Sequence, residues 1–194
     1  VIEAVRNFGK AYRDTKLVHR LDKDTSGCQI IAKNNQFLRR CNKLISDRKV
    51  KKTYQAVVHG KWTYKKGVYE MNLKKSKLLG NERMVKVSSL GKVAKSIFKP
   101  LEVKSSLSLL DCELITGRTH QLRVQLSELG FPIVGDNKYG FKGSNSLSSF
   151  SFKKRMYLHA NSFTAEELGI DIKVDPSEEF KKIIKISESI SKLS

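Results

Sequence analysis

The chain has 194 residues, enough for one folded domain whose core requires neither disulfides nor metal. With 39% hydrophobic and 29% charged residues and only short apolar runs, its composition excludes a disordered chain and a membrane-spanning helix. A net charge of +19 favours a polyanionic partner such as nucleic acid, because each phosphate that is neutralised releases counterions. Charge alone leaves two alternatives open, a lysine-rich surface without a partner and a membrane surface.

The chain starts at Val1, without a methionine or a signal-peptide pattern, which indicates a piece of a longer protein. Its cysteines, Cys28, Cys41 and Cys112, lie far apart and form no Cys-x-x-Cys pair. This spacing favours neither a zinc site nor a disulfide framework. We therefore expect reduced, buried thiols in a cytoplasmic protein.

In chain order, the first half predicts helix, loop, strand, helix and strand. Residues 1–12 carry apolar side chains at helical spacing. Within 17–33 a polar turn leads into an apolar stretch, which predicts a loop followed by a strand. Apolar side chains on one face predict an amphipathic helix over 35–47, and 53–59 is typical of a strand that ends at Gly60.

The second half predicts several strands and two helices. Strands are expected at four places, 68–71, 83–87, 94–101 and 108–115. After the break at Gly117, leucines at helical spacing predict a helix that Gly130 ends. The serine-rich stretch 143–152 predicts a surface loop, and 157–163 predicts a last strand. Asp175, followed by a proline, predicts the start of a C-terminal helix with three apolar residues inward, Phe180, Ile183 and Ile184. These elements predict one mixed α and β domain.

The first group of reactive side chains lies in a turn that runs from His19 to Gly27. Asp22 stands between two cations, Arg20 and Lys23, which favour the ionised carboxylate that a nucleophile requires. The hydroxyl side chains of the same turn can fix its backbone. An ordinary turn with solvated charges is the alternative interpretation.

Two further segments carry polar side chains that simple packing does not require. Tyr54 lies on an expected strand, where it could stack on a base, move a proton through its hydroxyl, or only pack. The helix after Gly117 opens with four polar side chains, Arg118, His120, Gln121 and Arg123. Guanidinium groups suit a carboxylate or a phosphate, although a solvated helix face is the alternative. The glycine-rich segment 130–140 favours a structural role over a chemical one.

Together, these segments resemble the RluA family of pseudouridine synthases. That family has an Arg-Leu-Asp-x-x-Thr-Ser-Gly turn, matched at 20–27, and a Lys-x-Tyr-x-Ala-x-Val-x-Gly strand, matched at 52–60. Its Thr-Gly-Arg-Thr-His-Gln-Leu-Arg-Val segment is matched at 116–124. A Gly-x-Pro-Ile-x-Gly-Asp-x-x-Tyr-Gly loop is matched at 130–140, and an x-Leu-His-Ala strand at 157–160. The joint match in this order is far more specific than any single motif.

The resemblance covers residues 1–165, and within the family the stretch 81–92 looks most like the C-type enzymes of large-subunit ribosomal RNA. It implies isomerisation of specific uridines in RNA, above all 23S ribosomal RNA, after the base has been flipped out. The isomerisation calls for no cofactor and no metal, which agrees with the lack of nucleotide-binding loops and metal-ligand spacing. We expect no membrane partner, and a monomer is the default expectation. The implied fold is α+β, with a mixed, mainly antiparallel central sheet, flanking helices and an active cleft across the sheet.

The same resemblance assigns roles to single residues. Asp22 would be the nucleophile, which attacks either the ribose C1′ or the uracil C6, and Tyr54 would stack on the target base and help to move a proton. Arg123 would pair with Asp22, and Arg20 would fill the gap that the flipped uridine leaves. Further positions are expected to bind substrate or RNA, namely His19, Arg118, His120 and Gln121.

The resemblance also implies that residues 1–194 form one catalytic domain, truncated at its N-terminus. The family's Lys-Pro-x-Gly segment is missing before the aspartate motif, as is the small N-terminal RNA-binding domain that many members carry. Gln125 stands where the family usually has histidine, and the segment 163–165 lacks the usual His-Pro. Neither position is expected to be catalytic.

Three other functions are weighed against the isomerase. A catalytically silent RNA-binding domain would not need Asp22, Tyr54 and Arg123 together. A metal-dependent nuclease would use a set of His and Asp side chains, His19, Asp22, Asp24 and His159, and would be abolished by EDTA. A ribosomal structural protein would fit the charge but would not explain the clustered reactive motifs.

Overall fold

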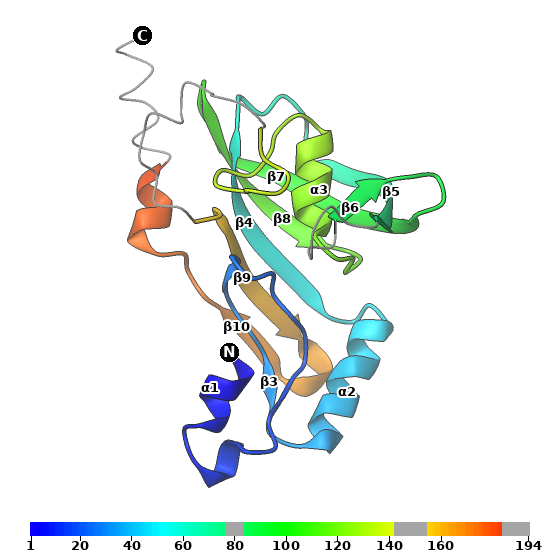
Figure 1. Ribbon diagram of the computed structural model, residues 1–194, viewed down its shortest axis with the longest axis vertical. Coiled ribbons are helices and arrows are strands. Elements are labelled where there is room, and N and C mark those ends of the chain that lie inside the picture. Colours follow the sequence, from blue (N-terminus) through cyan, green and yellow to red (C-terminus); the bar gives the residue numbers. More distant parts are fainter. Residues whose placement is uncertain (77–83, 142–154, 184–194) are drawn as a thin grey trace.

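An eight-stranded sheet forms the centre of the protein in a computed structural model that describes residues 1–76, 84–141 and 155–183 (Figure 1). Its strand order is β10 (Ile170–Lys173), β9 (Leu158–Ala165), β4 (Lys51–His59), β8 (Leu107–Leu114), β7 (Lys92–Val103), β5 (Gly67–Ser76) and β6 (Met84–Val87). These neighbours all pair antiparallel, and β2 (Ser26–Gly27) adds one short parallel pairing to β9. The expected mixed, mainly antiparallel sheet is therefore confirmed.

Two helices cover different parts of this sheet. The helix α2 (Asn35–Ser46) begins where the Asn34 side chain accepts a hydrogen bond from the Phe37 amide at 2.8 Å, and it buries Cys41 and Leu44. The helix α3 (Gln121–Glu128) lies over the middle strands, whereas α2 lies at the other end of the sheet (Figure 1). Both helices occupy the ranges that their apolar spacing predicts.

The apolar core is divided between the two helices. Under α3, Leu122 and Leu126 pack with buried residues of β4, β7 and β8, among them Phe98. Under α2, Cys41 and Leu44 pack with Phe163 of β9. The strand β4 runs past both clusters, so the sheet links the two helices and leaves a space between them.

The N-terminal part is less regular than its sequence pattern predicts. The expected helix over 1–12 divides into α1 (Ile2–Arg6) and a 3₁₀ turn at Lys10–Tyr12, because Gly9 adopts a φ of 143° between them. Within 17–33, the single expected strand is replaced by the two-residue pairing of β1 (Lys16–Leu17) with β3 (Ile31–Ala32) and by β2. This part is held by side-chain contacts more than by strand pairing.

The remaining expected elements are present where the structure describes them. The strand β5 is longer than the expected 68–71, since β6 and β7 both pair with it. The expected C-terminal helix is described over 178–183, with Phe180 and Ile183 buried, whereas Ile184 and the expected loop 143–152 lie outside the described residues. Among the helices described, none is long and apolar enough to cross a membrane.

Candidate active site

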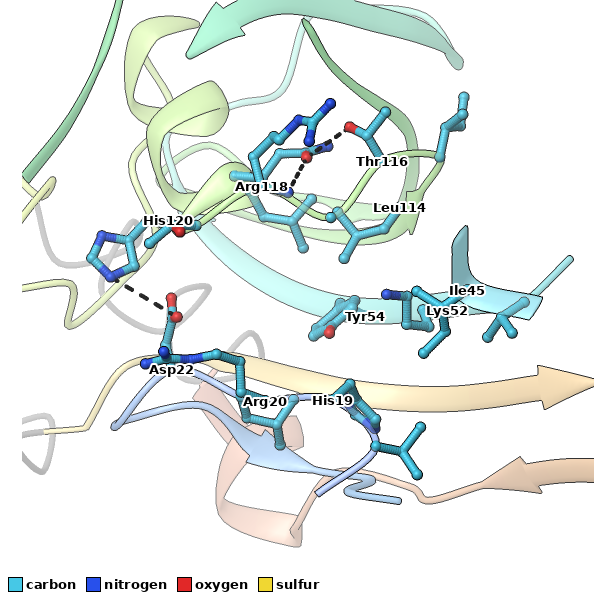
Figure 2. Close-up of a pocket in the computed structure, with 18 of the residues that line it drawn as sticks. His19, Arg20, Asp22, Ile45, Lys52, Tyr54, Leu114, Thr116, Arg118 and His120 are labelled. Atoms are coloured by element: carbon cyan, nitrogen blue, oxygen red, sulfur yellow. Dashed lines mark hydrogen bonds and ion pairs between the residues drawn. The ribbon is translucent and has the colours of Figure 1, made fainter. Parts of the chain in front are cut away.

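A pocket of about 550 Å³ opens between α2 and the start of α3, across the middle of the sheet (Figure 2). The loop 18–22 forms one wall, and the loop 115–120 with the first turn of α3 forms the opposite wall. The end of α2 and the strand β4 complete the lining. All eight predicted site residues line the pocket, although they come from segments up to about a hundred residues apart in the sequence. Two of them, Gln121 and Arg123, belong to α3.

The turn that carries Asp22 is fastened to β9. The Asp22 carbonyl accepts a hydrogen bond from the Thr25 amide at 3.0 Å, which closes the turn. Gly27 follows with a φ of 108°, and a Cβ there would collide with the Ala160 carbonyl, so the close pairing with β9 requires glycine. Ser26 Oγ lies 2.9 Å from His159 Nδ1. These contacts fix the backbone on which the Asp22 side chain stands.

Arg123 joins the two walls of the pocket through a pair of carboxylates. Its Nη1 donates to Asp22 Oδ2 at 3.2 Å. Its Nε and Nη2 donate to the two oxygens of Asp136, at 2.7 and 2.8 Å. Burial alone would lower the pKa of Arg123, but the hydrogen bonds and charges of Asp136 and Asp22 raise it above its ordinary value. The guanidinium is therefore permanently charged. Two of its N–H donors bind Asp136 in a bidentate pair, and a third binds Asp22.

Asp136 is the site residue that the sequence interpretation missed. Its side chain is fully buried, and burial opposes its ionisation. Arg123 and the amides of Lys138 and Tyr139 nevertheless lower the pKa of Asp136 below its ordinary value. Gly135 precedes it with a φ of 75°, where a Cβ would collide with the Arg155 carbonyl. The glycine-rich loop 130–140 thus supplies the counter-charge that a buried arginine requires.

His120 faces Asp22 from the α3 side, with its Nε2 3.9 Å from Asp22 Oδ1 (Figure 2). Its Nδ1 lies 2.8 Å from the Tyr139 hydroxyl, which accepts a hydrogen bond from the Val85 amide at 2.9 Å. Among the described residues, Nδ1 is the one acceptor of the Tyr139 hydroxyl proton, so Nε2 carries the proton of a neutral ring. Burial, followed by the charges of Arg123 and Lys138, lowers the pKa of His120 despite Asp22.

Tyr54 forms part of the floor of the pocket, on β4 and next to an irregularity of the neighbouring strand β9. The pairing of β4 with β9 shifts register between Thr53 and Tyr54, a β-bulge that leaves Asn161 without a partner across the ladder. Bulges of this kind re-aim a side chain next to a functional site. Burial, then the charges of Asp22 and Cys28, raises the pKa of Tyr54 to about 12. Its hydroxyl is therefore protonated at neutral pH, and Asp22 is close enough to act on it electrostatically.

The other predicted residues divide between the surface and the interior. Arg20 and Arg118 are exposed, and Arg118 Nε donates to the Val93 carbonyl at 3.0 Å. His19 stacks on Phe163 with ring centroids 5.2 Å apart, and its Nε2 accepts from the Ile30 amide at 3.1 Å. Burial, followed by the Lys52 charge, lowers the pKa of His19 to about 4. The two arginines are available to a partner, whereas one nitrogen of His19 is already used within the protein.

Gln121 uses both ends of its amide within the protein. Its Oε1 accepts from the Arg118 amide at 2.9 Å and from the Thr116 hydroxyl at 2.8 Å. Its Nε2 donates to the Lys95 carbonyl at 2.9 Å and to Ser96 Oγ at 2.8 Å. These four bonds fasten the loop 115–120 to β7. The buried Gln125 acts similarly, because its amide bonds Ser96 and two carbonyls of β5 and β7.

Comparison with known proteins assigns this fold and pocket to a family. A family model described as RNA pseudouridylate synthase matches residues 3–128, more than half of the chain, and the protein therefore belongs to that family. The RluA-type resemblance seen in the motifs is thereby confirmed.

Two curated relatives from different organisms carry the same name. The chain is 38% identical over 190 residues to the ribosomal large subunit pseudouridine synthase C of Pasteurella multocida (strain Pm70), which covers 95% of this chain and 58% of that protein. It is 39% identical over 166 residues to the enzyme of the same name from Haemophilus influenzae (strain ATCC 51907 / DSM 11121 / KW20 / Rd), covering 86% and 52%. The chain thus spans somewhat more than half of the length of these relatives.

Solved structures share the fold. Human RNA Pseudouridylate Synthase Domain Containing 1 superimposes with a TM-score of 0.71 at 26% identity, over 86% of this chain and 71% of that one. Human RNA Pseudouridylate Synthase Domain Containing 4 gives a TM-score of 0.75 at 24% identity, over 91% and 77%, which supports the fold alone.

Proposed function

We propose that the protein isomerises specific uridines of RNA to pseudouridine, with Asp22 as the nucleophile. The observation that carries this proposal is the placement of Asp22. Its carboxylate faces a pocket, is bound by a buried arginine at 3.2 Å, and lies opposite the buried ring of Tyr54. A carboxylate that only stabilised the fold would not need an open pocket in front of it.

The chemistry follows from the groups present. An oxygen of Asp22 forms a bond to C1′ as the C1′–N1 bond breaks, and the electron pair leaves with uracil. The base then turns, C5 attacks C1′, and the carboxylate is released. The proton lost from C5 is balanced by one gained at N1. In the alternative route the first bond forms at C6. Either way the net reaction is an isomerisation, so it calls for no hydride, phosphoryl or metal chemistry.

Arg123 is a positioning residue in this proposal. Its bidentate bond to Asp136 fixes the guanidinium plane, so that Nη1 holds Asp22 Oδ2 towards the pocket. Gln121 also serves positioning, because its amide fastens the loop that carries Arg118 and His120. We propose that His120, through its Nε2 proton, helps to orient the second oxygen of Asp22 or the substrate.

Tyr54 and the exposed cations would receive the RNA. A base within a stack cannot be reached by Asp22, so the uridine must be flipped into the pocket, where the Tyr54 ring offers a stacking surface. Figure 2 shows Arg20 on the same side of the pocket as Asp22, where its exposed side chain can occupy the vacated stack. Arg118, on the opposite wall, would bind a backbone phosphate. His19 also lines the pocket and would contact the RNA there.

The substrate that we propose is large-subunit ribosomal RNA, because the relatives are named for that activity and match most of this chain. The net charge of +19 supports an RNA partner. We further propose that residues 1–194 are the catalytic domain of a cytoplasmic, monomeric enzyme whose RNA-binding domain lies upstream. Its three cysteines are free and buried, as expected for that compartment.

Incubation with unmodified large-subunit ribosomal RNA tests this function. Wild-type protein and Asp22→Ala are compared, both as the 194-residue chain and in the full-length natural protein, and pseudouridine is mapped by carbodiimide-stop primer extension. Stops that require Asp22 are the expected result. RNA binding without any stop in the full-length protein would overturn the proposal in favour of a silent RNA-binding domain.

The same assay separates the isomerase from a metal-dependent nuclease. Among the described residues, no group of three or more His, Cys, Asp or Glu side chains is arranged to hold a metal. His159, one residue of that alternative set, instead bonds Ser26 and the Val174 carbonyl. EDTA should therefore leave the stops unchanged, and RNA cleavage that EDTA abolishes would favour the nuclease.

A further inference from the structure

Lys52 lies on the floor of the pocket beside the proposed base-binding tyrosine. It precedes Tyr54 by two positions on β4, so both side chains leave the same face of the strand. Its Nζ lies beside Gly117, 3.6 Å from the position that a Cβ on that residue would take. Figure 2 shows the Lys52 ammonium directed towards Tyr54. The ammonium is therefore placed next to the space that a stacked base would fill.

Lys52 differs from the other cations that line the pocket. Arg123 is bound by two carboxylates, and Arg118 by a backbone carbonyl. Arg20, Arg48 and Lys52 have no hydrogen-bond or ion-pair partner within the described part of the chain, but the two arginines are exposed to water. Burial lowers the pKa of Lys52 below its ordinary value. A half-buried cation without a counter-charge costs folding stability, which calls for an explanation.

Both routes of the proposed isomerisation place negative charge on the uracil ring. If Asp22 attacks C1′, the electron pair of the C1′–N1 bond leaves with the base, and the resulting anion is delocalised over N1, C5 and the two carbonyl oxygens. If Asp22 attacks C6, the electrons of the C5=C6 bond move onto C5 and O4. A fixed positive charge close to the ring lowers the energy of either species, and a poorly solvated pocket strengthens its effect.

We propose that Lys52 stabilises the anionic uracil that forms during the isomerisation, a role that rests on the proposed function. The alternative, a contact with a backbone phosphate, is less favoured by the position of the ammonium. Phosphates stay near the mouth of the pocket when a base enters it, where the exposed Arg20 and Arg118 are available. Lys52 is instead beside Tyr54, at the depth of the base.

Single-turnover release of tritium from C5-labelled uridine in a large-subunit ribosomal RNA transcript tests this assignment in the full-length natural protein. Lys52→Met should lower the rate constant at saturating enzyme by about 100-fold. Lys52→Arg, which keeps the charge, should recover most of the rate. The matched control is Lys51→Met, since Lys51 is the next residue, lies on the opposite face and forms an exposed ion pair with Glu113 at 3.3 Å.

Binding and stability measurements separate this role from others. Lys52→Met should leave the salt dependence of RNA affinity unchanged, whereas loss of one phosphate contact would reduce the slope by about 0.9. Its unfolding temperature should be unchanged or higher, because an unpaired buried charge is removed. A rate within about twofold of wild type, a reduced salt slope in place of a rate loss, or a lower unfolding temperature with no rescue by arginine would each overturn the assignment. Absence of tritium release from wild type would instead overturn the proposed function, and the assignment with it.

Discussion

The two sides of the pocket differ in how their side chains are bonded. On the α3 side, the charged side chains that line the pocket bond other groups of the protein. On the β4 side, the side chains of Tyr54 and Lys52 have no hydrogen-bond or ion-pair partner among the described residues. Arg123 is shared between Asp136 and Asp22, and His120 is bound by Tyr139. Groups that position other groups are satisfied within the protein, because their geometry must exist before substrate arrives. Groups that receive substrate are left unsatisfied at some cost to the fold. The α3 side therefore positions catalytic groups, whereas Tyr54 and Lys52 on the β4 side form a receiving floor, the surface that would contact the substrate base.

Substitution of Arg123 tests the α3 side of the pocket, where the charged side chains have partners. Arg123→Met leaves Asp22 and the fully buried Asp136 without a counter-charge. We expect a loss of about 3–5 kcal/mol in the free energy of unfolding, measured by urea denaturation, because breaking a buried pair leaves an uncompensated charge. Tritium release should be lost as well.

The matched control is Arg118→Met, which removes an exposed arginine whose Nε binds one carbonyl. Its free energy of unfolding should stay within about 0.5 kcal/mol of wild type. If both variants were equally stable, Arg123 would not be the cation that joins the two walls.

Substitution of Tyr54 tests whether the β4 side of the pocket binds the substrate base. Tyr54→Leu removes the ring, and affinity for RNA that contains the target uridine should fall by about 1–3 kcal/mol, the usual contribution of one base stacked on an aromatic side chain. Tyr54→Phe keeps the ring and should bind RNA as wild type does, because the hydroxyl has no hydrogen-bond partner among the described residues. Filter binding measures both affinities, and equal affinity of the Phe and Leu variants would show that Tyr54 does not stack.

The two sides also differ in how far the sequence predicts them. Apolar spacing predicts α2 within a residue because that helix buries one face, whereas α3, which is buried on more than one side, is predicted from its leucines and from the glycines that flank it. Asp22 and Arg123 are 101 positions apart, and their contact was expected through the resemblance to a family, since no local pattern encodes it. The short strands β1 and β2 were missed because two residues are too few to show a period, whereas β3 lies within the strand expected at the end of 17–33.

Asp136 and Lys52 were missed for opposite reasons. Asp136 follows a glycine in a loop, and the glycines drew the structural interpretation, although a buried arginine on the neighbouring helix requires a carboxylate somewhere. Lys52 is one of many lysines in a chain with a net charge of +19, so composition does not show that its side chain points inward. Only the packing of β4 against the loop 115–120 distinguishes it from Lys51.

The pH dependence of the reaction tests whether the charge of the Lys52 ammonium contributes to the rate. Lys52 is charged below its pKa, and burial lowers that pKa, so its charge is lost at a lower pH than for an exposed lysine. The single-turnover rate of the wild type should therefore fall as pH rises, and the fall should begin at a lower pH than the ordinary lysine pKa of about 10.4 would give. Lys52→Arg should abolish this decrease. A decrease that persists unchanged in the arginine variant would assign it to another group.

His19 lies between the two sides of the pocket and is held neutral by burial. Its pKa is lowered from 6.5 to about 4, by burial and then by Lys52, so the unfolded chain takes up a proton before the folded one as pH falls. Stability should decrease from about pH 6.5 to about pH 4 and level off below that, by about 1–2 kcal/mol after allowance for partial exposure. His19→Phe keeps a ring against Phe163 but cannot titrate, so urea denaturation of the RNA-free protein should show a shallower acid dependence than wild type. Parallel pH curves for the two proteins would mean that folding does not lower the pKa of His19.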